Sequence, residues 1–121
     1  MSEETLSHEE SSGDDPTPAA RESNPNLLSA MAGEYFGTFV LVFFGVGSVN
    51  AAVATGAQAG LWQVAVVWAV GVSLGIYTAA SLSGAHINPA ITVVAAVYDR
   101  FPARWVVPYW VAQVAGAATA S

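Results

Sequence analysis

Residues 83–90 read Ser-Gly-Ala-His-Ile-Asn-Pro-Ala and separate two long apolar runs of the chain. Their glycine and proline interrupt helical structure, and their histidine and asparagine add polar groups. A bilayer tolerates irregular backbone only where protein buries it or a water-filled cavity borders it. The segment therefore indicates a pore or a binding site inside a membrane protein, rather than an apolar anchor.

The composition is that of a membrane protein with a charged tail. Of 121 residues, 54% are hydrophobic and 10% are charged, whereas a soluble domain carries about 25% charged residues. The first 26 residues hold seven acidic residues and one arginine, which account for the whole formal charge of −6. The absence of cysteine excludes disulfides and thiol chemistry. The absence of a basic patch argues against binding to nucleic acid.

The N-terminal segment differs from the rest of the chain. Residues 1–26 are rich in serine, aspartate, glutamate and proline, and such a composition cannot offset the entropy lost on ordering. The segment also lacks the basic start and short apolar core of a secretory signal. We expect a disordered acidic tail over residues 1–26 and a membrane domain over residues 27–121.

Two uncharged or nearly uncharged segments are long enough to cross a membrane. Residues 30–54 contain Glu34 as their only charge, and residues 61–82 contain none; a transmembrane helix needs about 20 residues. Residues 55–60 between them read as a loop. The second segment contains Gly71 and Gly75, which indicate either a close helix crossing or the ordinary glycine enrichment of membrane helices.

The next segment is too short to cross. Asn88 is a favoured N-cap and Pro89 is favoured at the first helical position, while Asp99 and Arg100 end the apolar pattern. A helix over residues 89–98 would be about 15 Å long, roughly half of the ~30 Å hydrocarbon core. We expect a half-helix that enters the membrane and stops. Residues 104–121 are apolar again, and because this pattern is unfinished at the last residue we expect a truncated protein.

The arginines predict how the chain crosses the membrane. Two full crossings separate Arg21 from Arg100 and Arg104, so all three should lie on one side. The positive-inside rule assigns this side to the cytoplasm. We expect a multi-pass protein of the cell (plasma or inner) membrane with a cytoplasmic N-terminus, in contact with the lipid bilayer.

The half-helix also predicts a chemistry. Its N-terminus would place unpaired N–H groups and about half a positive charge near the membrane centre, and the Asn88 amide adds two donors. Residues 84–86 should run extended and offer carbonyl acceptors. Acceptors followed by central donors suit a neutral, hydrogen-bonding solute. Titratable groups are too few for an enzyme, and nothing points to a metal or cofactor.

Two ionisable residues of the apolar part remain to be explained. Intramembrane acids are candidates for function, but Glu34 lies near the end of its helix, where its side chain could also reach the membrane surface. His86 has no carboxylate nearby in the sequence to orient it. We therefore interpret His86 as a hydrogen-bonded structural residue rather than a proton-transfer group.

Three motifs resemble those of the aquaporin and glycerol-facilitator family, the major intrinsic proteins. Residues 83–92 resemble its first NPA signature, residues 33–38 its helix-one motif and residues 113–117 its helix-three motif. The resemblance covers about residues 32–121. It implies an all-α membrane protein whose family fold is a six-span, right-handed bundle of two inverted repeats, assembled as a homotetramer. This chain resembles the first repeat only: helices 1 and 2, the re-entrant half-helix and the start of helix 3. The facing NPA turn and the filter arginine of the second repeat are absent, so the chain alone should not form a complete pore.

The resemblance also implies roles for individual residues. Asn88 corresponds to the NPA asparagine that donates to the passing solute, and Pro89 and Ala90 hold the turn. Glu34 corresponds to a buried glutamate that braces the carbonyl ladder. The carbonyls that line the cytoplasmic half-pore belong to three residues: Gly84, Ala85 and His86.

The resemblance favours glycerol and similar small polyols as solutes, with some water. Residues 43–47 and 66–68 resemble bacterial glycerol facilitators, and Trp68 matches the aromatic residue of their selectivity filter. Alternatively, Trp68 belongs to the interfacial aromatic belt, and the protein is a water-selective aquaporin. If Ser121 is the true C-terminus, a non-conducting fragment becomes the leading interpretation.

Overall fold

The computed structural model describes residues 26–57 and 60–121. The expected acidic tail falls almost entirely outside these residues. Within them the chain is helical and forms no strand. The elements in order are α1 (Leu27–Thr55), α2 (Leu61–Ser83), α3 (Pro89–Tyr98), the 3₁₀ helix η2 (Ala103–Trp105) and α4 (Val106–Ala120).

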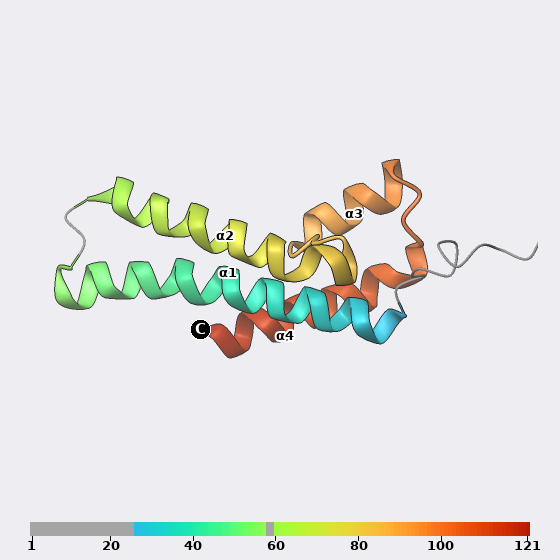
Figure 1. Cartoon of the computed structure of the whole chain (residues 1–121), viewed down its shortest axis with the longest axis horizontal. Helices are drawn as coiled ribbons and strands as arrows, with labels where there is room; N and C mark the ends of the chain where they lie inside the picture. The colour runs from blue at the N-terminus through green and yellow to red at the C-terminus, as the bar shows by residue number, and fades with distance from the viewer. Residues whose placement is uncertain (1–25, 58–59) are drawn as a thin grey trace, which may run out of the picture.

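Helices α1 and α2 form a long antiparallel pair (Figure 1). The side chain of Asn26 caps α1 by accepting a hydrogen bond from the Ser29 N–H at 3.0 Å, and Gly56 ends the helix in the left-handed conformation, with φ of 65°. Both helices are long and apolar enough to cross a membrane. They extend the predicted segments by three residues at the start of α1 and by one residue at the end of each helix.

A glycine contact brings this pair together. A Cβ atom on Gly75 would lie 2.6 Å from the carbonyl oxygen of Gly37, and one on Gly71 would lie 2.9 Å from Cβ of Phe44. Both distances are shorter than real Cβ atoms allow, so only glycine permits this approach. Of the two interpretations of Gly71 and Gly75, the structure therefore supports a close helix crossing.

Helix α3 is the predicted half-helix, with the predicted bounds. It begins beside the last turns of α2 and runs toward the end of the molecule where α1 starts (Figure 1). Helix α4 returns from that end and crosses α1, where a Cβ atom on Gly116 would clash with the Tyr35 carbonyl. The Tyr35 hydroxyl also hydrogen-bonds the Thr119 hydroxyl at 2.9 Å. Pro108 lies in the first turn of α4, where proline leaves no broken hydrogen bond.

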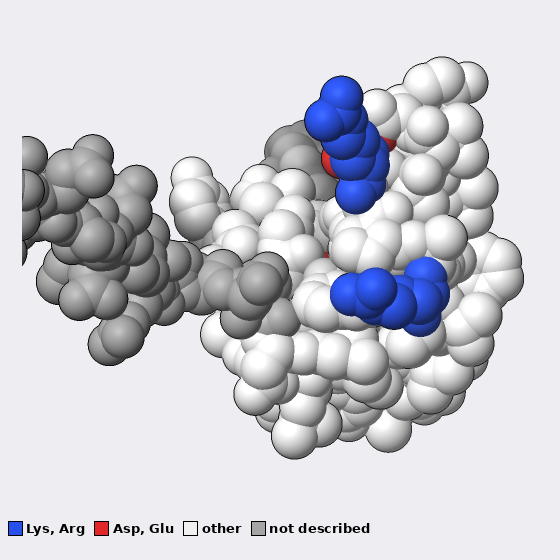
Figure 2. All heavy atoms as spheres, turned by 90° about the vertical axis from the view of Figure 1, so that its right-hand side faces the viewer, with Lys and Arg blue, Asp and Glu red and all other residues white. Residues whose placement is uncertain are grey.

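The N-terminus of α1 and the connection from α3 to α4 lie at the same end of the molecule (Figure 1). Arg100 and Arg104 are both exposed on the face at this end (Figure 2). This arrangement agrees with the prediction as far as Arg100 and Arg104 are concerned, and Arg21 lies outside the described residues.

The interior of the described part is unusually polar for a helical protein. Its largest fully buried side chains are Tyr109, Gln113, Glu34 and Thr92, whereas large apolar side chains cover much of the outer surface. A soluble protein has the opposite distribution. Lipid accepts apolar side chains and requires polar groups to be satisfied internally, so this distribution suits a membrane.

Candidate functional site

The segment between α2 and α3 has a left-handed backbone at several residues. Gly84 caps α2 with φ of 82°, and the next positive values are 55° at Ala85 and 42° at Ile87. Such values are unfavourable for residues with a Cβ atom, and most of all for a β-branched one. The predicted extended run over residues 84–86 is therefore wrong at Gly84 and Ala85, because the αL cap of α2 continues into the segment.

Three successive N–H groups of this segment point into the protein. The N–H of Ala85 donates to Oγ of Ser83 at 3.1 Å. The N–H groups of His86 and Ile87 donate to the two carboxyl oxygens of Glu34, at 2.9 and 2.6 Å. These protein contacts fix the backbone in its strained conformation.

The inward N–H groups determine where the carbonyl groups point. All peptide bonds in the described part are trans, and in a trans peptide the C=O is directed opposite to the N–H of the next residue. The carbonyls of Ala85 and His86 therefore point away from Glu34, and the carbonyl of Gly84 points away from Ser83 Oγ. Among the described residues they have no hydrogen-bond partner, so all three acceptors remain available.

Glu34 organises the opposite side. Its side chain is 0% exposed. In addition to the two backbone N–H groups, it accepts from the Ser83 hydroxyl at 2.6 Å and from Nε2 of Gln113 at 2.7 Å. Four donors fill the acceptor positions of its two oxygens. Of the two interpretations of Glu34, the structure supports the internal one, since the side chain does not reach the membrane surface.

A second set of bonds joins α3 and α4 to this centre. Nε2 of Gln113 also donates to Oγ1 of Thr92 at 3.0 Å, and Thr92 lies 3.2 Å from Nδ1 of His86. The Tyr109 hydroxyl donates to the Ser83 carbonyl at 2.9 Å. The imidazole of His86 packs against the rings of Tyr109 and Phe101, with centroids 5.2 and 4.7 Å away. These contacts fit a structural role for His86.

Asn88 lies where the irregular segment meets α3. Its side-chain oxygen accepts the N–H of Ala90 at 2.9 Å and so caps the helix. Pro89 follows at the first helical position, as predicted. Because the oxygen is engaged by the cap, the two N–H donors of the exposed Asn88 amide remain available.

A groove of about 360 Å³ lies against this segment. Its walls come from α1, α2, the segment and α3, and it is lined by Leu41, Val72, Ile76, Ala85, His86, Ile87, Asn88 and Ile91. Among the described residues, none that lines the groove is charged. The groove therefore combines apolar walls with the backbone and amide groups of the irregular segment.

Trp68 lies outside the residues that line the groove. It precedes Val72 and Ile76 at intervals of four residues, so the three share one face of α2. Its indole packs on α1 at Gly45, where an added Cβ atom would lie 2.5 Å from the ring. Trp68 thus continues the groove-facing side of α2 toward the end remote from the arginines.

Sequence reasoning missed several residues of this site. Thr92, Tyr109 and Ser83 complete the hydrogen-bond network, and the amide of Gln113 donates to both Glu34 and Thr92. The sequence could have identified Gln113 as a candidate, because it is the only strongly polar side chain in its apolar segment. Trp110 adds a further contact, since its indole N–H donates to the Pro89 carbonyl at 3.1 Å. The described residues contain no group of side chains that could hold a metal ion.

Known proteins share this architecture. The family described as "Major intrinsic protein" matches residues 21–121. The chain is 46% identical over 94 residues to a propanediol uptake facilitator of Citrobacter freundii, covering 78% of this chain and 35% of that protein. It is 48% identical over 84 residues to a glycerol uptake facilitator protein of Escherichia coli K12, covering 69% and 30% respectively. The X-ray structure of the aquaglyceroporin from Plasmodium falciparum superposes with a TM-score of 0.74 and 32% identity, over 78% of this chain and 39% of that one. The chain thus spans about a third of the length of the curated relatives it matches.

Proposed function

Because this chain belongs to the major intrinsic protein family, we propose that it forms part of a membrane channel for passive diffusion of glycerol and similar small neutral solutes, with some water. The activity belongs to the whole channel, of which the groove beside residues 84–88 would be one wall. Relatives named for glycerol and propanediol uptake support small polyols as the solute class.

The pattern of hydrogen-bonding groups along the groove carries this proposal. The outward carbonyls of Ala85 and His86 are followed by the Asn88 amide, whose oxygen is engaged and whose N–H groups are available. A polyol hydroxyl both donates and accepts hydrogen bonds. As the solute moves along such a wall, the hydroxyl can therefore replace its hydrogen bond to one group with a hydrogen bond to the next. The apolar side chains opposite, Leu41, Val72 and Ile76, suit the carbon backbone of the solute.

The same wall disfavours ions. None of the described residues that line the groove is charged, and the carboxylate of Glu34 is buried behind the segment with four donors. The N-terminus of α3 contributes a partial positive charge beside Asn88. Cations would meet this field without a compensating anion, whereas a neutral solute would only be oriented by it.

Trp68 supports a preference for polyols over water alone. It extends the apolar face of α2 beyond Val72 and Ile76, and a broad indole offers surface to a carbon chain.

We further propose that the protein acts as a homotetramer in the cell membrane. Its N-terminus and the face that carries Arg100 and Arg104 would lie in the cytoplasm.

The test uses the protein expressed from its complete open reading frame, reconstituted in proteoliposomes. Stopped-flow light scattering measures glycerol entry and, in parallel, water efflux. We expect glycerol entry well above that of empty liposomes and a large loss in Asn88→Ala. Asn50→Ala is the matched control, because Asn50 is exposed near the far end of α1. Fast water flux with glycerol excluded would place the protein among water-selective channels, and no flux of either solute would refute the proposal.

A further inference from the structure

The half-helix α3 is attached to α4 at two points. Trp110 and Gln113, three residues apart on α4, bond to Pro89 and Thr92, which are three residues apart on α3. Residues at this spacing lie on one face of a helix. The two bonds therefore connect one face of α4 with one face of α3.

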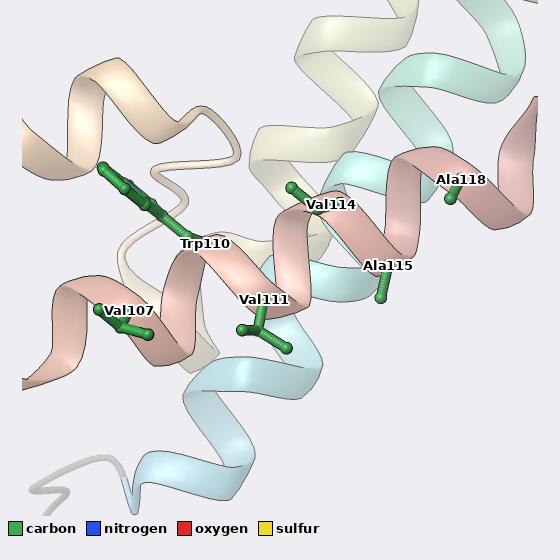
Figure 3. A pocket seen from close by; sticks show the side chains of 6 residues that line it. All are labelled: Val107, Trp110, Val111, Val114, Ala115 and Ala118. Atoms are coloured by element: carbon green, nitrogen blue, oxygen red, sulfur yellow. The ribbon is translucent and has the colours of Figure 1, made fainter.

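The bond from Trp110 is unusual because Pro89 does not require it. The Pro89 carbonyl lies in the first turn of α3, where it is an acceptor for the helix itself, and a carbonyl oxygen has a second lone pair for the indole. The indole leaves α4 toward α3 (Figure 3). Trp110 is 39% exposed, so its ring spans from the outer surface of α4 to the residue next to Asn88.

Two attachment points restrict α3 more than one does. Gln113 holds α3 at Thr92, and Glu34 holds the preceding segment at Ile87, so neither bond acts on the first turn of α3 itself. The second bond, at Pro89, fixes the first turn and with it the direction of the adjacent Asn88 amide. We propose that Trp110 is a positioning residue that keeps Asn88 turned toward the groove, an inference whose effect on solute flux rests on the proposed function.

The experiment removes the indole N–H in the full-length protein. Trp110→Phe keeps an aromatic ring and loses the donor, and Trp62→Phe is the matched control, because Trp62 is 68% exposed and makes no hydrogen bond among the described residues. Loss of a hydrogen bond worth about 0.5–1.5 kcal/mol corresponds to a factor of about two to ten. We expect glycerol permeability to fall by about this factor in Trp110→Phe, with water permeability less affected and the unfolding temperature near that of the wild type.

A second measurement does not depend on transport. None of these 121 residues is cysteine, so Ile91→Cys, on the α3 side of the groove, can be labelled with a water-soluble thiol reagent once any cysteine in the rest of the full-length protein has been replaced by serine. We expect Trp110→Phe to change the labelling rate of this cysteine by about two- to tenfold, and Trp62→Phe to leave it unchanged. If the wild type conducts nothing while the labelling rate shifts, the proposed function fails and the positioning role stands.

Two results would overturn the inference. If Trp110→Phe has the permeability and the labelling rate of the wild type, the hydrogen bond from the indole to Pro89 does not position Asn88. Equal losses of glycerol flux, water flux and unfolding temperature would mean that the bond stabilises the fold as a whole and does not position Asn88.

Discussion

Gln113 Nε2 lies 2.7 Å from Oε2 of Glu34, which joins residues 79 positions apart in the chain. This bond ties α4 to α1 and, through the second bond of the same amide to Thr92, to α3. The two side chains are at the centre of the buried network, and the irregular segment depends on them for the direction of its peptide groups.

Glu34→Gln should destabilise the protein strongly. The substitution replaces one acceptor oxygen with an NH₂ group that faces two donors, so two hydrogen bonds to a carboxylate are lost. At about 1.5–3 kcal/mol each, we expect a loss of about 3 kcal/mol or more, visible as a lower unfolding temperature in detergent, together with loss of flux. Asp99→Asn, an exposed acid directly after α3, is the control. Wild-type stability of Glu34→Gln would mean that this network contributes little.

Gly75→Ala should destabilise the α1–α2 crossing, because the new Cβ atom would lie 2.6 Å from the Gly37 carbonyl oxygen. Overpacking of this kind typically costs about 1–3 kcal/mol. Gly47→Ala is the matched control, since no atom lies within 4 Å of its added Cβ and alanine is the better helix former by up to about 1 kcal/mol. Thermal unfolding of both variants distinguishes them; equal unfolding temperatures would argue against a tight crossing.

Ile87→Ala should loosen the irregular segment. The buried side chain of Ile87 packs where α1 and α2 cross, against Gly37 and Gly75. A buried isoleucine replaced by alanine typically costs about 2–5 kcal/mol. The same substitution at Ile91, which is 50% exposed, should cost much less. Chemical or thermal unfolding measures the difference, and a similar effect of both substitutions would show that Ile87 is not an anchor.

Trp68→Ala should weaken the discrimination between polyols in the full-length channel. Removing the indole shortens the face that Trp68 shares with Val72 and Ile76, so polyols larger than glycerol should enter faster relative to glycerol. Liposome swelling with a series of polyols measures the ratio, and Trp62→Ala is the control. An unchanged ratio would assign Trp68 to packing against Gly45 alone.

The sequence predicted α3 well because its signals are local. The N-cap Asn88, the first-turn Pro89 and the charged pair after Tyr98 lie next to the ends that they define. The same reasoning selected Glu34 as an acid inside an apolar helix.

The connections of these residues could not be predicted in the same way. The donors to Glu34 lie 49 to 79 residues away in the chain, and Trp110 contacts Pro89 only because α4 crosses at a particular angle and rotation. The sequence of an apolar helix does not show which of its faces packs against protein, because lipid and the protein interior accept the same apolar side chains. The left-handed backbone at Ala85 and Ile87 is also set by distant contacts, since neither residue type favours it.

The Glu34 network has a consequence for the order of biosynthesis. Glu34 is made with α1, but its donors follow with the end of α2, the irregular segment and finally Gln113 in α4. A carboxyl group without these donors is unfavourable in the hydrocarbon core. The last of these donors emerges from the ribosome some 79 residues after the acceptor, so the half-helix is held by the full Glu34 network only once α4 has been synthesised.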